Sequence, residues 1–479
     1  MKITEGGMES RRGNKSNPMR SSLKDSREAN NKPISVKGKP DRKAGAQSRR
    51  VQEKRMAGLP EMKREDLMKG LRIGFIVFAV ALITFGLSGM AFAFHSGGVA
   101  ECMGCHNIHD GQSASALLIA SDPSSTCANA SCHGNTGAGS YHILTPTNVA
   151  GVPPTQMTPG GDFGWLLKTY TYSPRSGTTS TDLGEHHGHN IVAADLPGFV
   201  ADDNNTTAPG GDMNSSAFAC TDCHDQHGKL RRLSTGAFAI TGAPIIGSGS
   251  YSTSVDPIAG QAVGAYRLLR GPGSAAGPSG KTFTTVFNAV VPSTYNRSEA
   301  TAPTHVAYGA GISDWCATCH PDMLASASSK HTHPTNQGVS STIVANYNSY
   351  LGSGLKGASG YDSLVPYQTA NSTDYPALRA IALDNTSNAQ IATSDKVMCL
   401  SCHRSHASGF EFMGRWNNAG ELIAVEGLWP GKDSPNSIAS QAKYAQGRTV
   451  AETTAAYNGT NMHYSSYQRS LCNKCHAND

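Results

Sequence analysis

The stretch Cys399-Leu-Ser-Cys402-His403 is one of six Cys–Cys–His units that together contain all twelve cysteines of the chain. Numbered as motifs in chain order, the six are Cys102, Cys105, His106; Cys127, Cys132, His133; Cys220, Cys223, His224; Cys316, Cys319, His320; Cys399, Cys402, His403; and Cys472, Cys475, His476. Five read C-x-x-C-H, the signature of covalent attachment of c-type haem. The second motif has four residues between its cysteines instead of two.

The spacing of these motifs has a chemical reason. Two thiols at this separation can bond the two vinyl groups along one edge of a porphyrin, and the following His then lies beneath the iron as its proximal ligand. Structural zinc sites and disulfide frameworks also use paired cysteines, but neither requires His after every second Cys. We therefore expect six covalently bound c-type haems, with the six motif histidines as proximal iron ligands.

Further histidines are available for the opposite face of each iron. Twelve of the 18 His lie outside the motifs, and none of them occurs in the first 94 residues. Methionine is the alternative distal ligand and would raise the reduction potential, but several Met lie in the leader. We therefore expect bis-His coordination. The candidate distal ligands are His95, His109, His142, His189, His227, His333 and His406.

Three of these candidates, His109, His227 and His406, follow their own motif histidine by three residues. Because one helical turn separates the two rings, the second ring cannot reach the other face of the same haem. Each should therefore bind the iron of a different haem. In the cluster His186-His187-Gly188-His189 we expect one member to bind iron and the others to be solvated, in preference to a separate metal site.

A hydrophobic segment precedes the first motif. Residues 71–94 contain one charge, Arg72, and Ala91-Phe92-Ala93 is typical of a signal-peptide cleavage site. The segment is also long enough to be an uncleaved membrane anchor. We expect cleavage, which gives a disordered basic extension at 1–70 (or a start placed too far upstream), a signal segment at 71–93 and a cytochrome domain at 94–479.

The net charge of +5 conceals opposite charges on the first 72 residues and on the rest of the chain. Residues 1–72 contain 20 of the 40 Lys and Arg but only 9 of the 35 Asp and Glu, so the remaining chain has 20 basic and 26 acidic residues. A basic tail can bind nucleic acid or lipid, but an acidic mature chain implies no nucleic-acid partner.

The segments between motifs are rich in Gly, Ser, Thr, Ala, Asn and Pro. We predict a mostly irregular coil with short α-helices and few β-strands, forming one elongated domain organised around a stacked haem chain that replaces a conventional core. Apolar periodicity predicts short helices at 114–120 and 377–383, and short strands at 266–269 and 281–291.

The chain resembles the OmcS-type hexahaem outer-surface c-type cytochromes, which form filaments in metal-reducing bacteria. The likeness covers nearly all of the region after residue 93. It includes Phe94-His-Ser-Gly-Gly-Val-Ala-Glu-Cys102, Thr158-Pro-Gly-Gly-Asp-Phe-Gly-Trp165, Gly188-His-Asn-Ile-Val-Ala193, Cys223-His-Asp-Gln-His-Gly-Lys229, Pro292-Ser-Thr-Tyr-Asn-Arg297 and Cys399-Leu-Ser-Cys-His-Arg404. The second motif departs from the family, which has C-x-x-C-H there, and the basic N-terminus has no counterpart.

The resemblance implies a nearly continuous chain of bis-His haems and a filament of head-to-tail protomers. It also implies that His109 reaches the next protomer and completes the coordination of its fifth haem, held by Cys399, Cys402 and His403. The seven distal candidates exceed the six places by one, and the surplus residue is His95 or His142.

We interpret the protein as a carrier of electrons and not as an enzyme, because an iron with two His ligands has no open site for substrate. The expected location is the outer surface or the extracellular space, with delivery to other multihaem cytochromes and acceptors such as metal oxides. A monomeric periplasmic or surface shuttle is the alternative. A multihaem reductase would need an open haem.

Overall fold

In the computed structural model the chain divides into two units, Met1–Leu87 and Ser88–Asp479, and all residues described below lie in the second. The structure describes residues 102–113, 116–134, 142–145, 147–155, 158–292, 306–324, 333–349, 365–369, 374–383, 390–457 and 466–476. The expected basic extension, the signal segment and the candidate ligand His95 lie outside these residues. Within the described ranges, no helix has both the length and the apolar character to cross a membrane.

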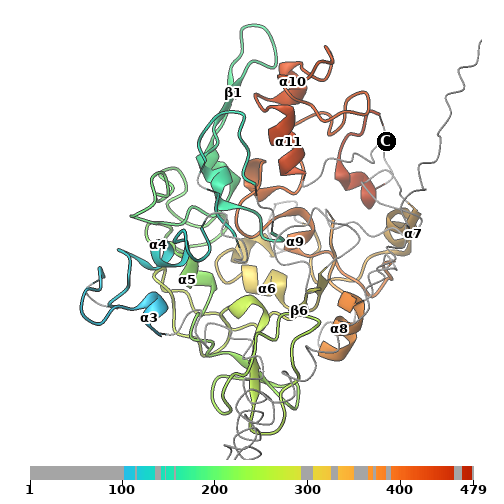
Figure 1. The fold of residues 1–479 in the computed structure, drawn as a ribbon. Helices are drawn as coiled ribbons and strands as arrows, with labels where there is room; N and C mark the ends of the chain where they lie inside the picture. The colour runs from blue at the N-terminus through green and yellow to red at the C-terminus, as the bar shows by residue number, and fades with distance from the viewer. Residues whose placement is uncertain are drawn as a thin grey trace, which may run out of the picture. The chain divides into compact units, whose positions relative to one another are not determined.

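Short helices are separated by long irregular segments (Figure 1). The described α-helices are α3 (Cys102–Cys105), α4 (Pro123–Cys127), α5 (Cys220–Cys223), α6 (Ile312–Cys316), α7 (Ser341–Ser349), α8 (Tyr375–Leu383), α9 (Cys399–Cys402), α10 (Ala442–Ala445) and α11 (Val450–Ala456). Single 3-10 turns occur at η1 (Phe163–Leu167), η2 (Gly184–His187), η3 (Tyr266–Leu268), η5 (Pro321–Met323), η6 (Glu411–Met413) and η7 (Leu471–Lys474). Several of these elements begin or end at a motif cysteine.

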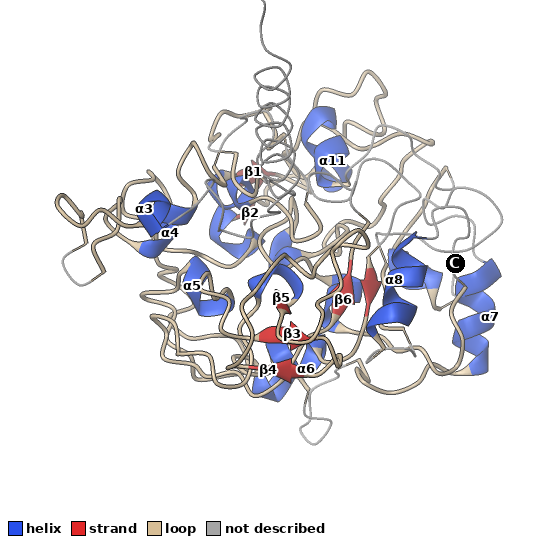
Figure 2. Cartoon of the chain, turned by 60° about the horizontal axis from the view of Figure 1, so that its bottom comes forward, coloured by secondary structure: helices blue, strands red, loops and turns tan. Residues whose placement is uncertain are grey.

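The described strands form small antiparallel sheets. They are β1 (Tyr170–Tyr172) with β2 (Ser180–Asp182); β3 (Arg231–Leu233) between β4 (Phe238–Ala239) and β5 (Ala262–Gly264); and β6 (Ala289–Val290) with β7 (Ala307–Tyr308). The register pairs Thr171 with Thr181 in the first sheet and Arg232 with Val263 in the second. In Figure 2, α8 lies beside β6, and both elements contribute to one apolar cluster.

Local hydrogen bonds explain where two of the helices begin. The carboxylate of Asp122 accepts the Ser125 N–H at 2.8 Å, and Pro123 occupies the first turn of α4, where its missing N–H has no cost. At α11, Thr449 and Glu452 cap each other's backbone N–H groups. The helix α4 that starts at this cap ends at Cys127, the first cysteine of the second motif.

The buried apolar side chains form several clusters along the described chain. The largest includes Trp165, Phe410 and Trp416, which are 0%, 2% and 3% exposed. Motif cysteines from four motifs pack against this cluster: Cys220, Cys223, Cys319, Cys402 and Cys475. The protein core is therefore built against the turns that would carry the haems.

The predicted coil-rich fold with short helices and few strands is confirmed. The helix expected at 377–383 is found as α8, which begins two residues earlier. The helix expected at 114–120 is wrong for its described residues 116–120, which form turns and a bridge. The strand expected at 266–269 is instead the 3-10 turn η3, and that expected at 281–291 is reduced to β6. Short apolar runs do not distinguish a strand from a tight turn.

Candidate haem-binding site

The backbone of the motifs brings each His back to its first Cys. The His N–H donates to the carbonyl of the first Cys in five motifs: His106 to Cys102 at 2.8 Å, His224 to Cys220 at 3.0 Å, His320 to Cys316 at 3.1 Å, His403 to Cys399 at 3.0 Å and His476 to Cys472 at 2.9 Å. This spacing of four residues is that of an α-helical hydrogen bond. The thiols and the imidazole therefore emerge within little more than one turn of backbone.

The second motif keeps this contact despite its two additional residues. The N–H of His133 donates to the carbonyl of Cys127 at 3.2 Å, although the two residues are six positions apart instead of four. The insertion closes as a local turn, in which the carbonyl of Asn129 accepts the N–H groups of Cys132 and Gly134. The second motif thus keeps the hydrogen bond between its His and its first Cys despite the departure from C-x-x-C-H.

Four motif histidines have their ring held in one orientation by a backbone carbonyl. The ring atom Nδ1 lies 2.7 Å from a carbonyl oxygen in each case: His106 with Ala116, His224 with Arg267, His320 with Pro209 and His403 with Phe412. Because a carbonyl only accepts, Nδ1 carries the proton and Nε2 has the lone pair. This is the usual outer contact of a metal-binding His, and it directs Nε2 toward the metal.

Histidine rings face one another in pairs that join distant parts of the chain. The ring centres are 6.3 Å apart for His106 and His227, 6.3 Å for His224 and His406, 6.2 Å for His320 and His189, and 6.4 Å for His476 and His333. Each pair joins one motif histidine to one of the distal candidates. His227 and His406 each face the histidine of a motif other than their own.

This separation fits an iron held from both faces. A metal–imidazole nitrogen bond is about 2 Å long, and a ring centre lies about 1.1 Å behind its nitrogen, given C–N bonds of about 1.33 Å. Two imidazoles across one iron then have centres about 6.3 Å apart. The observed distances of 6.2 to 6.4 Å match that value. The residues therefore fit six-coordinate haem iron at these four positions.

Burial favours the neutral, metal-binding form of three of the paired imidazoles, His406, His189 and His224. Burial and neighbouring histidines lower the pKa of His406 to about 3. Burial, followed by the charge of His320, lowers the pKa of His189 to about 4, and burial lowers that of His224 to about 4. A neutral ring offers its lone pair at neutral pH, so metal binding there releases no proton.

The remaining candidates have different surroundings. His142 is 4% exposed, and the next residue, Ile143, donates its N–H to the carbonyl of His133 at 3.1 Å. His142 therefore lies in the segment that runs beside the second motif. His109 is instead exposed, one turn beyond the first motif. The exposed ring of His109 is accessible to another molecule.

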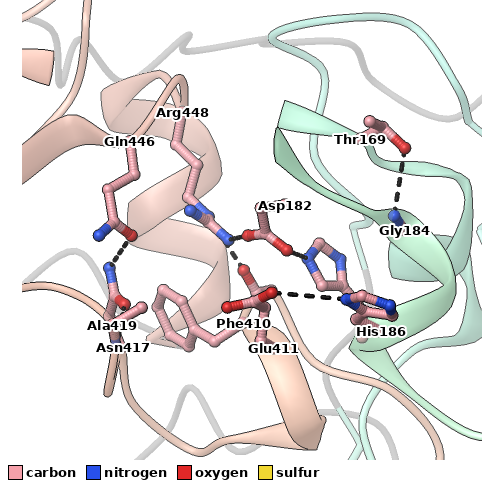
Figure 3. A network of polar contacts seen from close by, with 12 residues as sticks. Thr169, Asp182, Gly184, His186, Phe410, Glu411, Asn417, Ala419, Gln446 and Arg448 are labelled. Carbon is pink, nitrogen blue, oxygen red and sulfur yellow. Dashed lines mark hydrogen bonds and ion pairs between the residues drawn. The ribbon is translucent and has the colours of Figure 1, made fainter. Parts of the chain in front are cut away.

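The histidine cluster at 186–189 differs in part from expectation. His187 is not solvated but 0% exposed: Nδ1 is 3.0 Å from the carbonyl of Trp165, and Nε2 is 2.8 Å from the carboxylate of Asp182. Arg448 forms an ion pair with the other oxygen of Asp182, while His186 lies 3.5 Å from Glu411 (Figure 3). Both nitrogens of His187 have acceptors, so this ring is a structural group.

The cluster also connects two ligand candidates. The N–H of His189 donates to the carbonyl of His406 at 2.9 Å, and its Nδ1 lies 2.8 Å from the carbonyl of Ser405. Phe163 stacks on the ring of His406 with centres 4.7 Å apart. The segments around residues 187 and 406 therefore position each other, although His189 and His406 are 217 positions apart in the chain.

Three backbone segments share one arrangement that the sequence analysis did not predict. We call them the cradle segments, and they are 116–119, 267–270 and 412–415. In each cradle segment, the carbonyl of the first residue accepts a hydrogen bond from the ring of the motif His. The carbonyl of the second residue accepts the N–H of the residue that follows the motif His, and the N–H of the fourth residue donates to the carbonyl of the second motif Cys. Positive φ at Leu117, Leu268 and Met413 marks the shared bend. No side chain is common to all three segments (the first two share a Leu-Leu pair at the second and third positions, the last two an Arg at the fourth), so the repeat is recognised from its backbone contacts.

The helices of successive motifs also meet in pairs. The thiol of Cys127 lies within hydrogen-bonding distance of Cys220, and that of Cys316 lies similarly close to Cys399. The preceding serines, Ser124 and Ser313, each accept the N–H of the partner's first Cys at 3.3 Å. By contrast, Cys102 of the first motif and Cys472 of the last are exposed.

A coil-rich chain with six Cys–Cys–His turns and opposed histidine rings is the architecture of a c-type cytochrome. No family model matches the chain. It is 46% identical over 443 residues to the C-type cytochrome OmcS of Geobacter sulfurreducens. The aligned region covers 86% of this chain and 100% of OmcS. The cryo-EM structure of the OmcS nanowires and that of the OmcS filament are each 44% identical, with a TM-score of 0.69, over 80% of this chain and 100% of theirs. The chain belongs to the OmcS family of c-type cytochromes.

Proposed function

We propose that this protein conducts electrons along six bis-His haems and polymerises head to tail into extracellular filaments. When bound, such a haem accepts and passes on one electron and offers no open coordination site to a substrate. The opposed histidine rings at 6.2 to 6.4 Å are the observation that carries this proposal. The chain thus acts as a conductor and not as an enzyme.

The opposed rings suggest how the ligands are shared. The first, third, fourth and sixth haems take as distal ligands His227, His406, His189 and His333. We assign His142 to the second haem, because it is buried in the segment that runs beside His133. His95 is then the surplus candidate, and His109 remains for the fifth haem.

The histidine pairs also support the head-to-tail contact. The His three residues after the third motif faces the first motif, and the His three residues after the fifth faces the third. Continued by one step, the His three residues after the first motif of the next protomer, its His109, faces the fifth motif. Within one protomer the helix pairs join the second motif to the third and the fourth to the fifth. Cys102 of the first motif and Cys472 of the sixth are exposed, so we expect the sixth motif of one protomer to meet the first motif of the next.

Replacing His109 by Ala tests the filament. The variant should lose filaments in electron micrographs of the secreted protein, and its fifth haem should lose one axial ligand and give a high-spin ferric signal. His186→Ala, which removes a partly exposed His outside the ring pairs, is the matched control and should assemble normally. Filaments with six low-spin haems in the His109 variant would contradict the assignment and favour a monomeric shuttle.

We also propose that the haem-bearing chain is exported from the cell. Cleavage after Ala93 would release the haem-bearing chain from its basic extension and signal segment, as expected for delivery to the cell surface. Reduced copies would pass electrons to other multihaem cytochromes and to extracellular acceptors such as metal oxides. The mass of the secreted protein, with six added haems and Phe94 at its N-terminus, is the corresponding measurement.

A further inference from the structure

Three short backbone segments from distant parts of the chain lie side by side. We call them the ligand platform, and they are 160–161, 187–189 and 405–408. Ala407 bridges both other segments, one in parallel and one in antiparallel direction. The N–H of His406 donates to the carbonyl of Gly160 at 2.7 Å, and the carbonyl of His406 accepts the N–H of His189 at 2.9 Å. The segment 405–408 is therefore the middle one of the three.

The middle segment serves two neighbouring haem sites. It carries His406, whose ring centre lies 6.3 Å from that of His224 in the third motif. The carbonyl of Ser405, one residue earlier, lies 2.8 Å from Nδ1 of His189. The ring of His189 in turn faces that of His320 in the fourth motif at 6.2 Å. One stretch of backbone thus carries one distal ligand and orients the other.

Gly160 leaves room for the ring of His406. A Cβ added at Gly160 would lie 2.9 Å from Nδ1 and 3.0 Å from Cε1 of that ring, and 2.9 Å from the hydroxyl oxygen of Ser405. Non-bonded carbon atoms pack at about 3.5–4.0 Å, so these distances are too short. Phe163 already stacks on the face of the ring, with centres 4.7 Å apart. A methyl group at position 160 must therefore displace the ring from its place opposite the third motif.

Gly188 allows two backbones to approach each other. A Cβ added at Gly188 would lie 2.4 Å from the carbonyl oxygen of His406 and 2.5 Å from the Cβ of Ala407. The φ of Gly188 is −175°, which any residue adopts, so the close approach is what requires glycine. The carbonyl that the methyl group would strike is the one that accepts the N–H of His189. A side chain at position 188 must therefore move His189 away from the middle segment.

We propose that Gly160 and Gly188 are positioning residues for the distal ligands of two neighbouring haems. Gly160 positions His406 for the third haem, and Gly188 positions His189 for the fourth. This inference rests on the proposed function and on its ligand assignments. A binding group has to be held within about 0.5 Å of its working position, and a methyl group at either glycine forces a larger shift. The missing side chains let distant segments meet at both haems.

Electron paramagnetic resonance of the ferric secreted protein tests the proposal. His406→Ala and His189→Ala serve as references, because each removes one ligand and so identifies the low-spin component of one haem. Gly160→Ala should lose or shift the component that is missing from His406→Ala and keep that of His189. Gly188→Ala should lose or shift the component that is missing from His189→Ala. A role in stability alone would lower the free energy of unfolding without selecting a component.

A double variant keeps the test open if Gly160→Ala does not mature. In His406→Ala the ring is absent, so a methyl group at position 160 no longer meets it. Added imidazole should restore the low-spin component of His406→Ala, and the combination with Gly160→Ala should need about tenfold more imidazole. Gly247→Ala is the matched control, because its Cβ would meet only Cγ2 of Val255, at 3.3 Å. It should keep all low-spin components.

The proposal is overturned if Gly160→Ala or Gly188→Ala keeps the component assigned to its ligand, or if the double variant binds imidazole as tightly as His406→Ala. Loss of the same components in Gly247→Ala would also overturn it. Six low-spin haems in the wild-type protein support bis-His conduction whatever the glycine variants show. High-spin haem in assembled wild-type protein would overturn the proposed function as well.

Discussion

The described histidines fall into two groups according to the contacts of their two ring nitrogens. A ring with Nδ1 on a carbonyl and Nε2 directed toward a second ring, as in His320, can bind metal through its lone pair. A ring with acceptors at both nitrogens, as in His187, cannot. His187 and His189 are two residues apart and carry the same side chain. The contacts around each ring decide its role.

This contrast is testable with a pair of alanine variants. His189→Ala should convert one haem to a high-spin or water-ligated form, because its iron loses a distal nitrogen. His187→Ala should keep six low-spin haems but lower the free energy of unfolding by about 2–3 kcal/mol, because the buried carboxylate of Asp182 loses a hydrogen-bond partner. Electron paramagnetic resonance and chemical denaturation separate the two outcomes. A high-spin haem in the His187 variant would refute the structural assignment.

Short helices carry the motif cysteines, and two pairs of these helices pack together. α4 lies against α5, and α6 against α9, so each pair brings two motifs together (Figure 1). Helices of four or five residues are not stable alone, because forming the first turn is costly. Capping by Asp122, the serine contacts and packing against the apolar core hold them in place.

Removing a serine contact should loosen one helix pair. Ser313 is fully buried, and Ser313→Ala would leave the N–H of Cys399 without this acceptor. We expect the free energy of unfolding to fall by about 1 kcal/mol. Denaturation followed through the Soret band measures it. The control Ser176→Ala, in an exposed loop, should have no effect, and an equal change in both variants would argue against the pairing role.

At the scale of the whole described chain, the largest apolar cluster extends to the motif cysteines. Buried aromatic residues such as Trp165 and Phe410 share a cluster with motif cysteines. Bound haems would add large apolar surfaces to that cluster. Coil segments, which bury little apolar area by themselves, would then enclose the haems instead of packing on regular elements.

Haem attachment should therefore be a condition for folding. Chain produced without the haem-attachment machinery should show little regular tertiary structure, because the surface between its coil segments loses its apolar partner. Near-ultraviolet circular dichroism and limited proteolysis of haem-free and haem-loaded protein give the comparison. A protease-resistant haem-free chain with a cooperative unfolding transition would show that the apolar clusters suffice.

The six motifs alone predict the chemistry of attachment, because thioether formation and proximal ligation depend on residues within one span of five to seven positions. Composition predicts the coil-rich fold, and the count of histidines outside the motifs gives the candidate distal ligands. Which rings lie opposite one another follows from the folded chain, since His320 and His189 come together although they are 131 positions apart in the sequence. The cradle segments also emerged only from the folded chain, because they are defined by hydrogen bonds of backbone groups, which every residue carries.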